Sequence, residues 1–266
     1  MATIDITELT ITVIEPSVTQ GKIIINKLNQ LGVSSIQYYP SAQLALDFIA
    51  KFSPDLVISA MYLSDMTATE LVLKMRESPS MESIPFMLIT TENSFEALDP
   101  IKQAGTVAVL SKPFELKDLE NALYTTVDVL SVDEDFLEKF DWEDLNVLVV
   151  DDSPMAQKVV CGLLANIGVT KIDIGNNGKE AVSFIEDNYY DLVITDYNMP
   201  EMDGQALVSY IREKSNQQSV PVLMITSEQN EARLTAVNNA GVSGICDKPF
   251  EPKIFKKLIS KFFLEE

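Results

Sequence analysis

The chain has 266 residues, enough for two domains of ordinary size, and its 46% share of hydrophobic residues suffices for two packed cores. It carries 40 acidic against 20 basic residues, and the resulting net charge of −20 disfavours binding to nucleic acid or to an anionic membrane surface. It contains no histidine, which excludes the commonest metal ligand, the usual general base and a phosphohistidine carrier within the chain.

The two cysteines and the N-terminus indicate the cellular compartment in which the protein is expected. Cys161 and Cys246 both stand in apolar runs, which is typical of small buried side chains and not of a disulfide. The N-terminus has no basic stretch leading into an apolar one, and no segment reaches the roughly 18 apolar residues that span a bilayer. We therefore expect a soluble cytoplasmic protein.

The two halves of the chain repeat each other without gaps. A repeat of this length indicates two copies of one complete domain and not an array of short units. The following segments recur 136 residues further on: Asp55–Ile58 as Asp191–Ile194, Ile89–Thr90 as Ile225–Thr226, and Lys112–Glu115 as Lys248–Glu251.

Within each copy, short β-rich apolar runs alternate with helical patterns, which is typical of βαβ units around a parallel sheet. Ser153 and Pro154 predict the N-cap and first turn of one helix, which Gly168 ends, as Gly32 ends its counterpart. The second copy predicts five strands: Val147–Val150, Lys171–Ile174, Leu192–Thr195, Val222–Ile225 and Gly244–Cys246.

An acidic segment without a strand pattern joins the copies. We predict a first domain at 1–130, a connector at 131–144 and a second domain at 145–266. An ordered connector whose apolar groups pack on a domain is favoured over a flexible tether, because a solvated linker does not need three aromatic residues. It could continue the preceding helix, whose apolar spacing is helical. The apolar residues at issue are Phe136, Leu137, Phe140, Trp142 and Leu145.

Polar residues follow four strands of the second copy. Asp151 and Asp152 end the first strand, Asp196 the third and Thr226 the fourth, while Lys248 follows the fifth. Ligands of open α/β sheets bind beyond the carboxyl ends of the strands, so these five side chains are expected to converge on one pocket.

Three neighbouring carboxylates need a compensating cation. At an effective dielectric near 20, each close pair of charges repels by about 4 kcal/mol. Magnesium takes oxygen ligands and favours one or two carboxylates plus phosphate oxygens, which fits this set. Calcium is disfavoured, because no Asp-x-Asp-x-Asp-Gly loop is present.

This pattern resembles the receiver domain of two-component response regulators. The resemblance covers the whole second copy and, with the repeat, implies two tandem α/β domains of the flavodoxin-like (βα)5 type, each doubly wound with parallel strand order 2-1-3-4-5. A lone Asp-Asp pair or Lys-Pro-Phe would be a helix cap or a turn, but the motifs occur together and in order. The segments that carry the resemblance are Val149–Pro154, Leu192–Gly204, Met224–Ser227 and Asp247–Phe250.

The resemblance assigns a role to each residue. Asp196 would be the phosphoacceptor that attacks a phosphohistidine and forms an aspartyl phosphate. Asp151, Asp152 and Asp196, with the backbone carbonyl of Asn198, would hold Mg²⁺. In addition, the Thr226 hydroxyl and the Lys248 ammonium would bind the phosphoryl oxygens.

The resemblance also concerns residues around the pocket. It implies a cis peptide between Lys248 and Pro249, and it associates the side chains of Asn198 and Glu228 with the rate of phosphoryl loss. Family members often carry Tyr or Phe three residues before the lysine, but this chain has Ile245, so the aromatic part of the usual switch is missing.

The first copy has lost most of the pocket. Glu15, Pro16, Ala60 and Tyr62 stand under Asp151, Asp152, Asp196 and Asn198, while Thr90 and Lys112 remain. This copy resembles a degenerate pseudo-receiver, unable to accept a phosphoryl group or to hold magnesium in the family manner. We hypothesise that Lys112 pairs with Glu15. Ser59 is expected to point to the other sheet face and Asp65 to lie in a loop, so neither replaces the acceptor.

The favoured function is a response regulator that signals through phosphorylation-dependent protein contacts, with no separate output domain and no enzymatic activity beyond its own aspartyl phosphorylation and dephosphorylation. Its expected partners are a sensor histidine kinase or histidine phosphotransfer protein and a downstream protein target. The helix expected at Pro252–Phe263 is either a homodimer or partner surface or a core-facing helix. A phosphorelay intermediate and a phosphate sink are alternatives. A haloacid-dehalogenase-like phosphatase is disfavoured, because it needs Asp-x-Asp where Asp151-Asp152-Ser153 stands.

Overall fold

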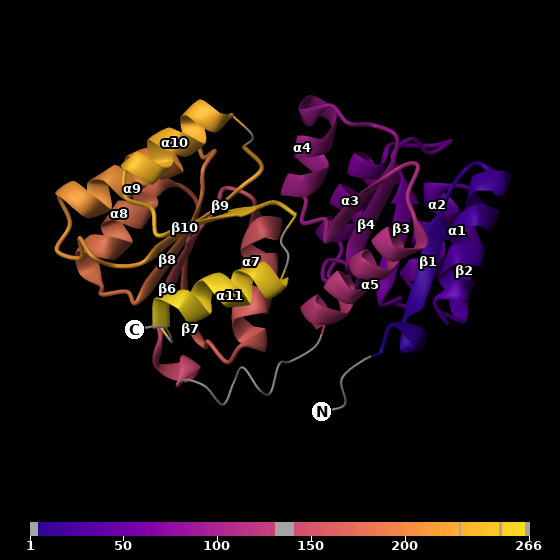
Figure 1. Ribbon diagram of the computed structural model, residues 1–266, viewed down its shortest axis with the longest axis horizontal. Coiled ribbons are helices and arrows are strands. Elements are labelled where there is room, and N and C mark those ends of the chain that lie inside the picture. The colour runs from indigo at the N-terminus through magenta and orange to yellow at the C-terminus, as the bar shows by residue number, and fades with distance from the viewer. Residues whose placement is uncertain (1–4, 131–140, 229, 250–251, 264–266) are drawn as a thin grey trace. The chain divides into compact units, whose positions relative to one another are not determined.

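The computed structural model describes residues 5–130, 141–228, 230–249 and 252–263. The chain divides into two compact units, Met1–Ser131 and Val132–Glu266, which we call unit 1 and unit 2. In Figure 1, unit 1 runs from indigo to magenta and unit 2 from pink to yellow.

Unit 1 is built around a five-stranded parallel sheet of order β2-β1-β3-β4-β5. This order confirms the prediction for the first copy. Its elements are η1 (Ile6–Glu8), β1 (Thr10–Ile14), α1 (Val18–Gln30), β2 (Ser35–Tyr39), α2 (Ala42–Ile49), β3 (Leu56–Ala60), α3 (Ala68–Glu77), β4 (Phe86–Thr90), α4 (Phe95–Gln103), β5 (Ala108–Ser111) and α5 (Leu116–Leu130).

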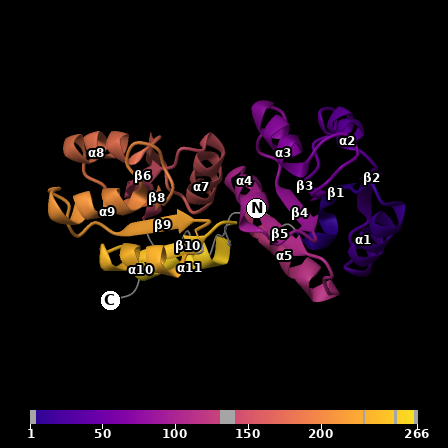
Figure 2. The ribbon, with the colours of Figure 1, turned by 90° about the horizontal axis from the view of Figure 1, so that it is seen from above.

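Two apolar layers cover the sheet of unit 1. Alternate residues of β3 point to opposite faces: Val57 packs with α2, α3 and α4, whereas Leu56 and Ile58 pack with α1 and α5. Figure 2 shows α2 and α3 on one side of these strands and α1 and α5 on the other. The inner strands β1, β3 and β4 are therefore buried on both faces, as in doubly wound proteins.

Unit 2 repeats this architecture with strand order β7-β6-β8-β9-β10, all parallel. The five predicted strands are confirmed, and each is longer by one residue at one end. Its elements are η2 (Trp142–Asp144), β6 (Asn146–Val150), α7 (Pro154–Asn166), β7 (Lys171–Gly175), α8 (Gly178–Asp187), β8 (Leu192–Asp196), α9 (Gly204–Glu213), β9 (Val222–Thr226), α10 (Glu231–Asn239), β10 (Gly244–Asp247) and α11 (Pro252–Phe263).

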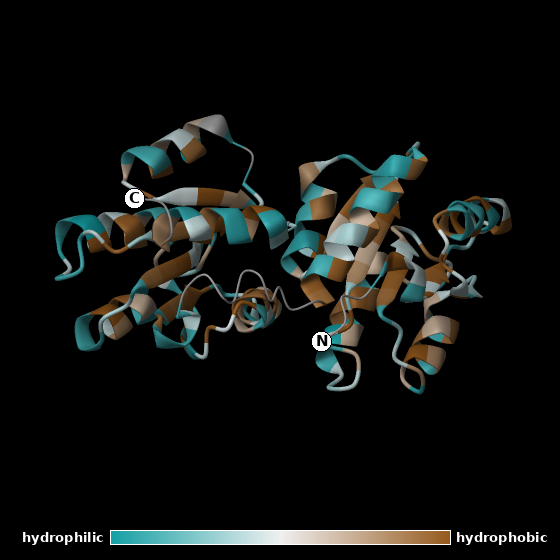
Figure 3. Cartoon of the chain, turned by 60° about the horizontal axis from the view of Figure 1, so that its bottom comes forward, coloured by the Kyte–Doolittle hydropathy of each residue, from teal (hydrophilic) through white to brown (hydrophobic). Residues whose placement is uncertain are grey.

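The core of unit 2 also lies on both faces of its sheet. Leu148 and Val150 of β6 pack with α8, α9 and α10. Helix α11 buries Phe255 and Ile259 completely, so this helix does have a core-facing side. Figure 3 shows the hydrophobic colour concentrated on the strands and the hydrophilic colour on the outer sides of the helices.

The predicted boundaries of the first helix in each unit are confirmed. The Ser153 hydroxyl accepts a hydrogen bond from the Ala156 N–H, and Pro154 occupies the first turn of α7. Gly32 and Gly168 adopt φ values of 88° and 90°, a left-handed conformation that glycine adopts without steric cost.

Both units contain an arginine clamp, buried in unit 1 and partly buried in unit 2, that the sequence did not single out. In unit 1, the Arg76 guanidinium donates hydrogen bonds to the carbonyls of Glu82, Ile84, Ala104 and Gly105. Arg212, 136 residues further on, donates to the carbonyls of Gln218, Val220 and Gly241. Each arginine thus satisfies the carbonyls of two loops that precede neighbouring strands.

Residues 131–140 of the predicted connector, including Phe136, Leu137 and Phe140, lie outside the described residues. The end of the segment is ordered: Trp142 is 2% exposed and its ring meets Phe263 of α11 edge-on, with 6.2 Å between ring centroids. For Trp142 this agrees with a connector whose apolar groups pack on a domain. No helix among the described residues is long and apolar enough to cross a bilayer.

Candidate functional site

The site of unit 2 lies at the carboxyl edge of its parallel sheet. Asp151 and Asp152 follow β6, Asp196 is the last residue of β8, and Thr226 is the last residue of β9. Lys248 follows β10, and its N–H donates to the Thr226 carbonyl, which extends the pairing of β10 with β9. The parallel register brings these ends to one edge, as the sequence predicts.

A buried lysine holds two of the carboxylates together. Lys248 Nζ lies 2.8 Å from Asp151 Oδ2 and 3.1 Å from Asp196 Oδ1. All three residues are at most 3% exposed. Burial alone would lower the pKa of the Lys248 ammonium, but the charges of Asp196 and Asp151 raise it above its ordinary value. Lys248 is therefore a fixed positive charge at the centre of the site.

One cation does not neutralise the three carboxylates. Oxygen atoms of Asp151, Asp152 and Asp196 all lie within 4.8 Å of one another. Burial raises the pKa of Asp196 to about 6, and Asp151 adds to this while Lys248 opposes it. Burial and the charge of Asp151 also raise the pKa of Asp152. The cluster therefore holds excess negative charge.

The donor set and the orientation of Asp196 fit a hard divalent cation. Asp196 Oδ2 accepts a hydrogen bond from the Asn198 N–H at 3.1 Å, whereas the buried Oδ1 is ion-paired with Lys248 and accepts no hydrogen bond from any other described residue. Asp152 is exposed, so the cluster can be approached from solvent. Oxygen ligands without nitrogen or sulfur are the set that Mg²⁺ prefers.

Thr226 reaches the site edge but does not bind Asp196. Its side chain is fully buried, and its hydroxyl oxygen accepts a hydrogen bond from the Glu228 N–H at 3.0 Å. No hydrogen bond joins this hydroxyl to Asp196 among the residues that the structure describes. The Glu228 carboxylate in turn lies 2.6 Å from the Arg233 guanidinium.

Gly204 lets α9 approach the back of Asp196. A Cβ at this position would lie 2.2 Å from the Asp196 carbonyl oxygen, closer than real Cβ contacts. The Gly204 N–H also donates to the Tyr197 carbonyl. A glycine at residue 204 is therefore required by the chain path around Asp196.

One supporting residue was missed by the sequence reasoning. The Gln157 amide donates to the Asp151 carbonyl at 2.6 Å and to Asn176 Oδ1 at 3.2 Å. Its side chain ties the loops after β6 and β7 together beneath the site. A glutamine one turn after the Ser153 N-cap was the available signal in the sequence, and in the structure its side chain is nearly buried.

Unit 1 keeps the lysine but not the acceptor. Lys112 Nζ lies 2.8 Å from Glu15 Oε2, which confirms the hypothesised pair, and Ala60 stands where unit 2 has Asp196. Both Lys-Pro bonds, Lys112–Pro113 and Lys248–Pro249, are cis, and the second of these was expected.

The two residues near the missing acceptor have structural tasks. The buried Ser59 donates its hydroxyl to the Ala60 carbonyl. Asp65 accepts hydrogen bonds from the Ala42 and Gln43 N–H groups and so caps α2, whose N-cap Ser41 makes no side-chain bond. Above Ala60, the Tyr62 hydroxyl donates to Glu92 at 3.2 Å.

Comparison with known proteins identifies the family to which the chain belongs. The response regulator receiver domain family matches residues 11–124 and 147–260. The chain is 31% identical over 119 residues to the chemotaxis protein CheY of Pseudomonas aeruginosa, covering 45% of this chain and 96% of that protein. It is 32% identical over 121 residues to CheY-3 of Vibrio cholerae, covering 46% and 93%. The solved structure of Vibrio cholerae CheY4 aligns over 45% of this chain and 98% of that chain, with 29% identity and a TM-score of 0.42.

The chain therefore belongs to the response regulator receiver domain family and carries two receiver domains in tandem. Receiver domains are the signalling modules of two-component systems and not conventional enzymes. Each of these curated relatives corresponds to less than half of this chain.

Proposed function

We propose that the chain is a response regulator in which Asp196 of unit 2 accepts a phosphoryl group. One observation carries the proposal: the buried Lys248 ammonium bridges the Asp151 and Asp196 carboxylates, and apart from this ion pair at 3.1 Å, Asp196 Oδ1 accepts no hydrogen bond from any described residue. Such an oxygen is available as a nucleophile, and the Lys248 ammonium beside it offsets charge that builds up on a transferred group.

In the proposed reaction, an Asp196 carboxylate oxygen attacks the phosphorus of a phosphohistidine on the donor. An O–P bond forms while the N–P bond breaks, and the electron pair of that bond stays on the imidazole nitrogen, which takes up a proton. Lys248 binds a phosphoryl oxygen, and the Thr226 hydroxyl binds a second one after leaving the Glu228 N–H.

A magnesium ion would be held by Asp151, Asp152, Asp196 and the Asn198 carbonyl, and when bound it would neutralise excess carboxylate charge and the charge of the incoming phosphoryl oxygens. Asp151 also accepts a hydrogen bond from the Ser153 N–H, which keeps its carboxylate aimed at the cluster. The buried Gln157 amide holds the backbone of the same loop.

Unit 1 is proposed to be a pseudo-receiver at 1–130, joined by a connector at 131–144 to the phosphoacceptor domain at 145–266. Ala60 supplies no nucleophile, and the Glu15 and Lys112 side chains neutralise each other. A receiver that keeps its core without its acceptor serves as a binding surface.

The proposed partners are a sensor histidine kinase or histidine phosphotransfer protein as donor and a downstream protein that recognises the phosphorylated state. Relay and sink functions differ in where the phosphoryl group goes next. Transfer from Asp196 back to a histidine protein indicates a relay intermediate, whereas hydrolysis alone indicates a sink or a terminal regulator.

Intact-mass spectrometry after incubation with acetyl phosphate tests the proposal. We expect one phosphoryl adduct that requires magnesium and disappears in Asp196→Ala. The matched control is Asp187→Ala, an exposed aspartate at the end of α8, which should keep the adduct. No adduct would overturn the acceptor proposal, and a second adduct would overturn the pseudo-receiver assignment.

A further inference from the structure

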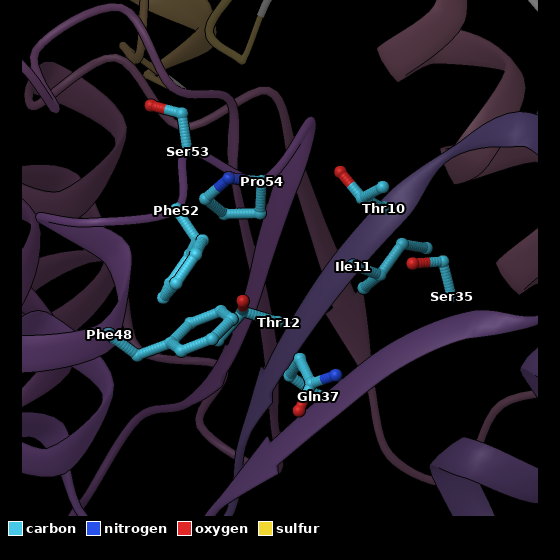
Figure 4. A pocket seen from close by; sticks show the side chains of 9 residues that line it. All are labelled: Thr10, Ile11, Thr12, Ser35, Gln37, Phe48, Phe52, Ser53 and Pro54. Carbon is cyan, nitrogen blue, oxygen red and sulfur yellow. The ribbon is translucent and has the colours of Figure 1, made fainter.

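A pocket of about 240 Å³ opens in unit 1 beside β1 and β2, lined also by Phe48, Phe52 and Pro54 at and beyond the end of α2. Figure 4 shows the rings of Phe48 and Phe52 on one side and the strands with Thr12 and Gln37 on the other. Thr12 and Gln37 lie at paired positions of the two strands. None of the described residues that line the pocket is charged.

The aromatic wall of the pocket is partly open to solvent. The rings of Phe48 and Phe52 lie 5.1 Å apart between centroids and are tilted by 30°. Phe52 is 62% exposed, an unusual position for a phenylalanine. A planar apolar group in the pocket would cover this ring and remove its surface from water.

The pocket contains a polar atom without a partner. Thr12 is fully buried, and its hydroxyl makes no hydrogen bond with any described residue. A buried hydroxyl without a partner is unfavourable, because it has lost its hydrogen bonds to water. A ligand that brings one hydrogen-bonding group to Thr12 would remove this cost.

Unit 2 has the same framework, but it carries a larger side chain at the position of Pro54. The counterpart of Pro54 is Tyr190, which is 7% exposed and packs in the core with Leu148, the counterpart of Thr12. The Tyr190 hydroxyl donates to Asp173, the counterpart of Gln37, at 2.7 Å. Unit 2 thus fills with its own phenol ring the position at which unit 1 has a pocket.

We propose that the unit 1 pocket binds a small uncharged ring compound that carries one hydrogen-bonding group, in the place that Tyr190 occupies in unit 2. The ring lies against Phe48 and Phe52, and the polar group reaches Gln37 and Thr12. Gln37 can both donate and accept, whereas Asp173 only accepts, so the pocket takes hydroxyl and carbonyl substituents alike. The lack of charged lining residues disfavours ionic ligands.

The test uses p-cresol, the side-chain analogue of tyrosine, titrated into the isotope-labelled full chain and followed by NMR. We expect saturable shifts confined to β1, β2, α2 and residues 50–55. Toluene, which lacks the hydroxyl, should bind more weakly. Absence of saturable shifts with p-cresol, or shifts centred elsewhere, would overturn the proposal.

Two variants locate the site. The triple variant Thr12→Leu, Gln37→Asp, Pro54→Tyr copies the residues with which unit 2 fills the same position, and it should abolish binding. Thr12→Val keeps the shape of the side chain at position 12 and removes its hydroxyl. It should weaken the binding of p-cresol about tenfold without weakening the binding of toluene. If p-cresol binds the triple variant as before, the site is elsewhere. If the triple variant does not fold, equal affinities of Thr12→Val and the parent chain for p-cresol would overturn the proposal.

Discussion

Glu15 and Lys112 of unit 1 lie 2.8 Å apart, the same separation as Asp151 and Lys248 at the equivalent positions of unit 2. The pair persists although the acceptor position holds alanine. Glu15 is 5% exposed, and its buried carboxylate needs a positively charged partner. Glu15 is one carbon longer than Asp151, its equivalent in unit 2, and it serves as the partner of Lys112 in unit 1.

We predict that Lys112→Ala destabilises unit 1. Removing one partner of a buried ion pair costs ~3–5 kcal/mol, and the 18% exposure of the Lys112 side chain reduces our expectation to about 2 kcal/mol. Hydrogen exchange of the β1 and β5 amides measures the loss. The double variant Glu15→Gln, Lys112→Ala should recover part of it, and an unchanged stability of Lys112→Ala would contradict a stabilising pair.

Asp196→Asn should stabilise metal-free unit 2, with a defined pH dependence. The pKa of Asp196 in the folded chain, about 6, is raised above its ordinary value of 3.8 by burial. The protonated carboxyl therefore contributes stability that is complete below pH 3.8 and is lost as the pH rises through 6. Asparagine stays neutral at every pH. The gain in free energy of unfolding of Asp196→Asn over the parent chain should therefore grow from pH 4 to 6 and reach about 2 kcal/mol.

Trp142, the single tryptophan, reports this transition because it is buried in unit 2. Denaturation in EDTA, followed by its fluorescence, gives the free energy of unfolding at each pH. Asp187→Asn serves as the exposed control and should show no such trend. If the stability gained by Asp196→Asn instead decreased between pH 4 and 6, the predicted direction of the pH dependence would be wrong.

Gly204→Ala should destabilise unit 2 by at least about 2 kcal/mol and reduce phosphorylation of Asp196. Its Cβ would lie 2.2 Å from the Asp196 carbonyl oxygen, so the backbone of the acceptor has to move. Gly162→Ala is the matched control in the same unit, because a Cβ there meets nothing within 4 Å. In an exposed helix position this change should stabilise by ~0.5–1 kcal/mol.

Arg76→Met should destabilise unit 1 by about 3 kcal/mol, because it leaves buried carbonyls of two loops without their donor. Arg76 is 8% exposed, and burial lowers its pKa to about 10. Arg212 of unit 2 is more exposed than Arg76, so Arg212→Met should destabilise its unit by less. Thermal unfolding with domain-specific probes compares the two, and a larger loss from Arg212→Met would contradict burial as the cause.

The sequence by itself predicted the repeated fold and the side chains that gather at the carboxyl edge of the second sheet. A constant offset of 136 residues and alternating patterns predicted two parallel sheets, because strand and helix periodicities are local properties of the chain. The carboxyl ends of parallel strands meet at one edge of the sheet. The sequence therefore predicted that Asp151, Asp196 and Lys248 lie close together. The pair of Glu15 with Lys112 followed from the substitution pattern, because Glu15 stands at the position of Asp151 and Ala60 at the position of Asp196.

Only the tertiary structure decided the contacts that depend on side-chain direction. The Thr226 hydroxyl turns to the Glu228 N–H, Gln157 ties two loops beneath Asp151, and Arg76 clamps loops that no local pattern connects. The pocket beside Thr12 is of the same kind, since a cavity is the space left by residues distant in sequence. Periodicity specifies which face a residue occupies, but packing in three dimensions specifies what it touches.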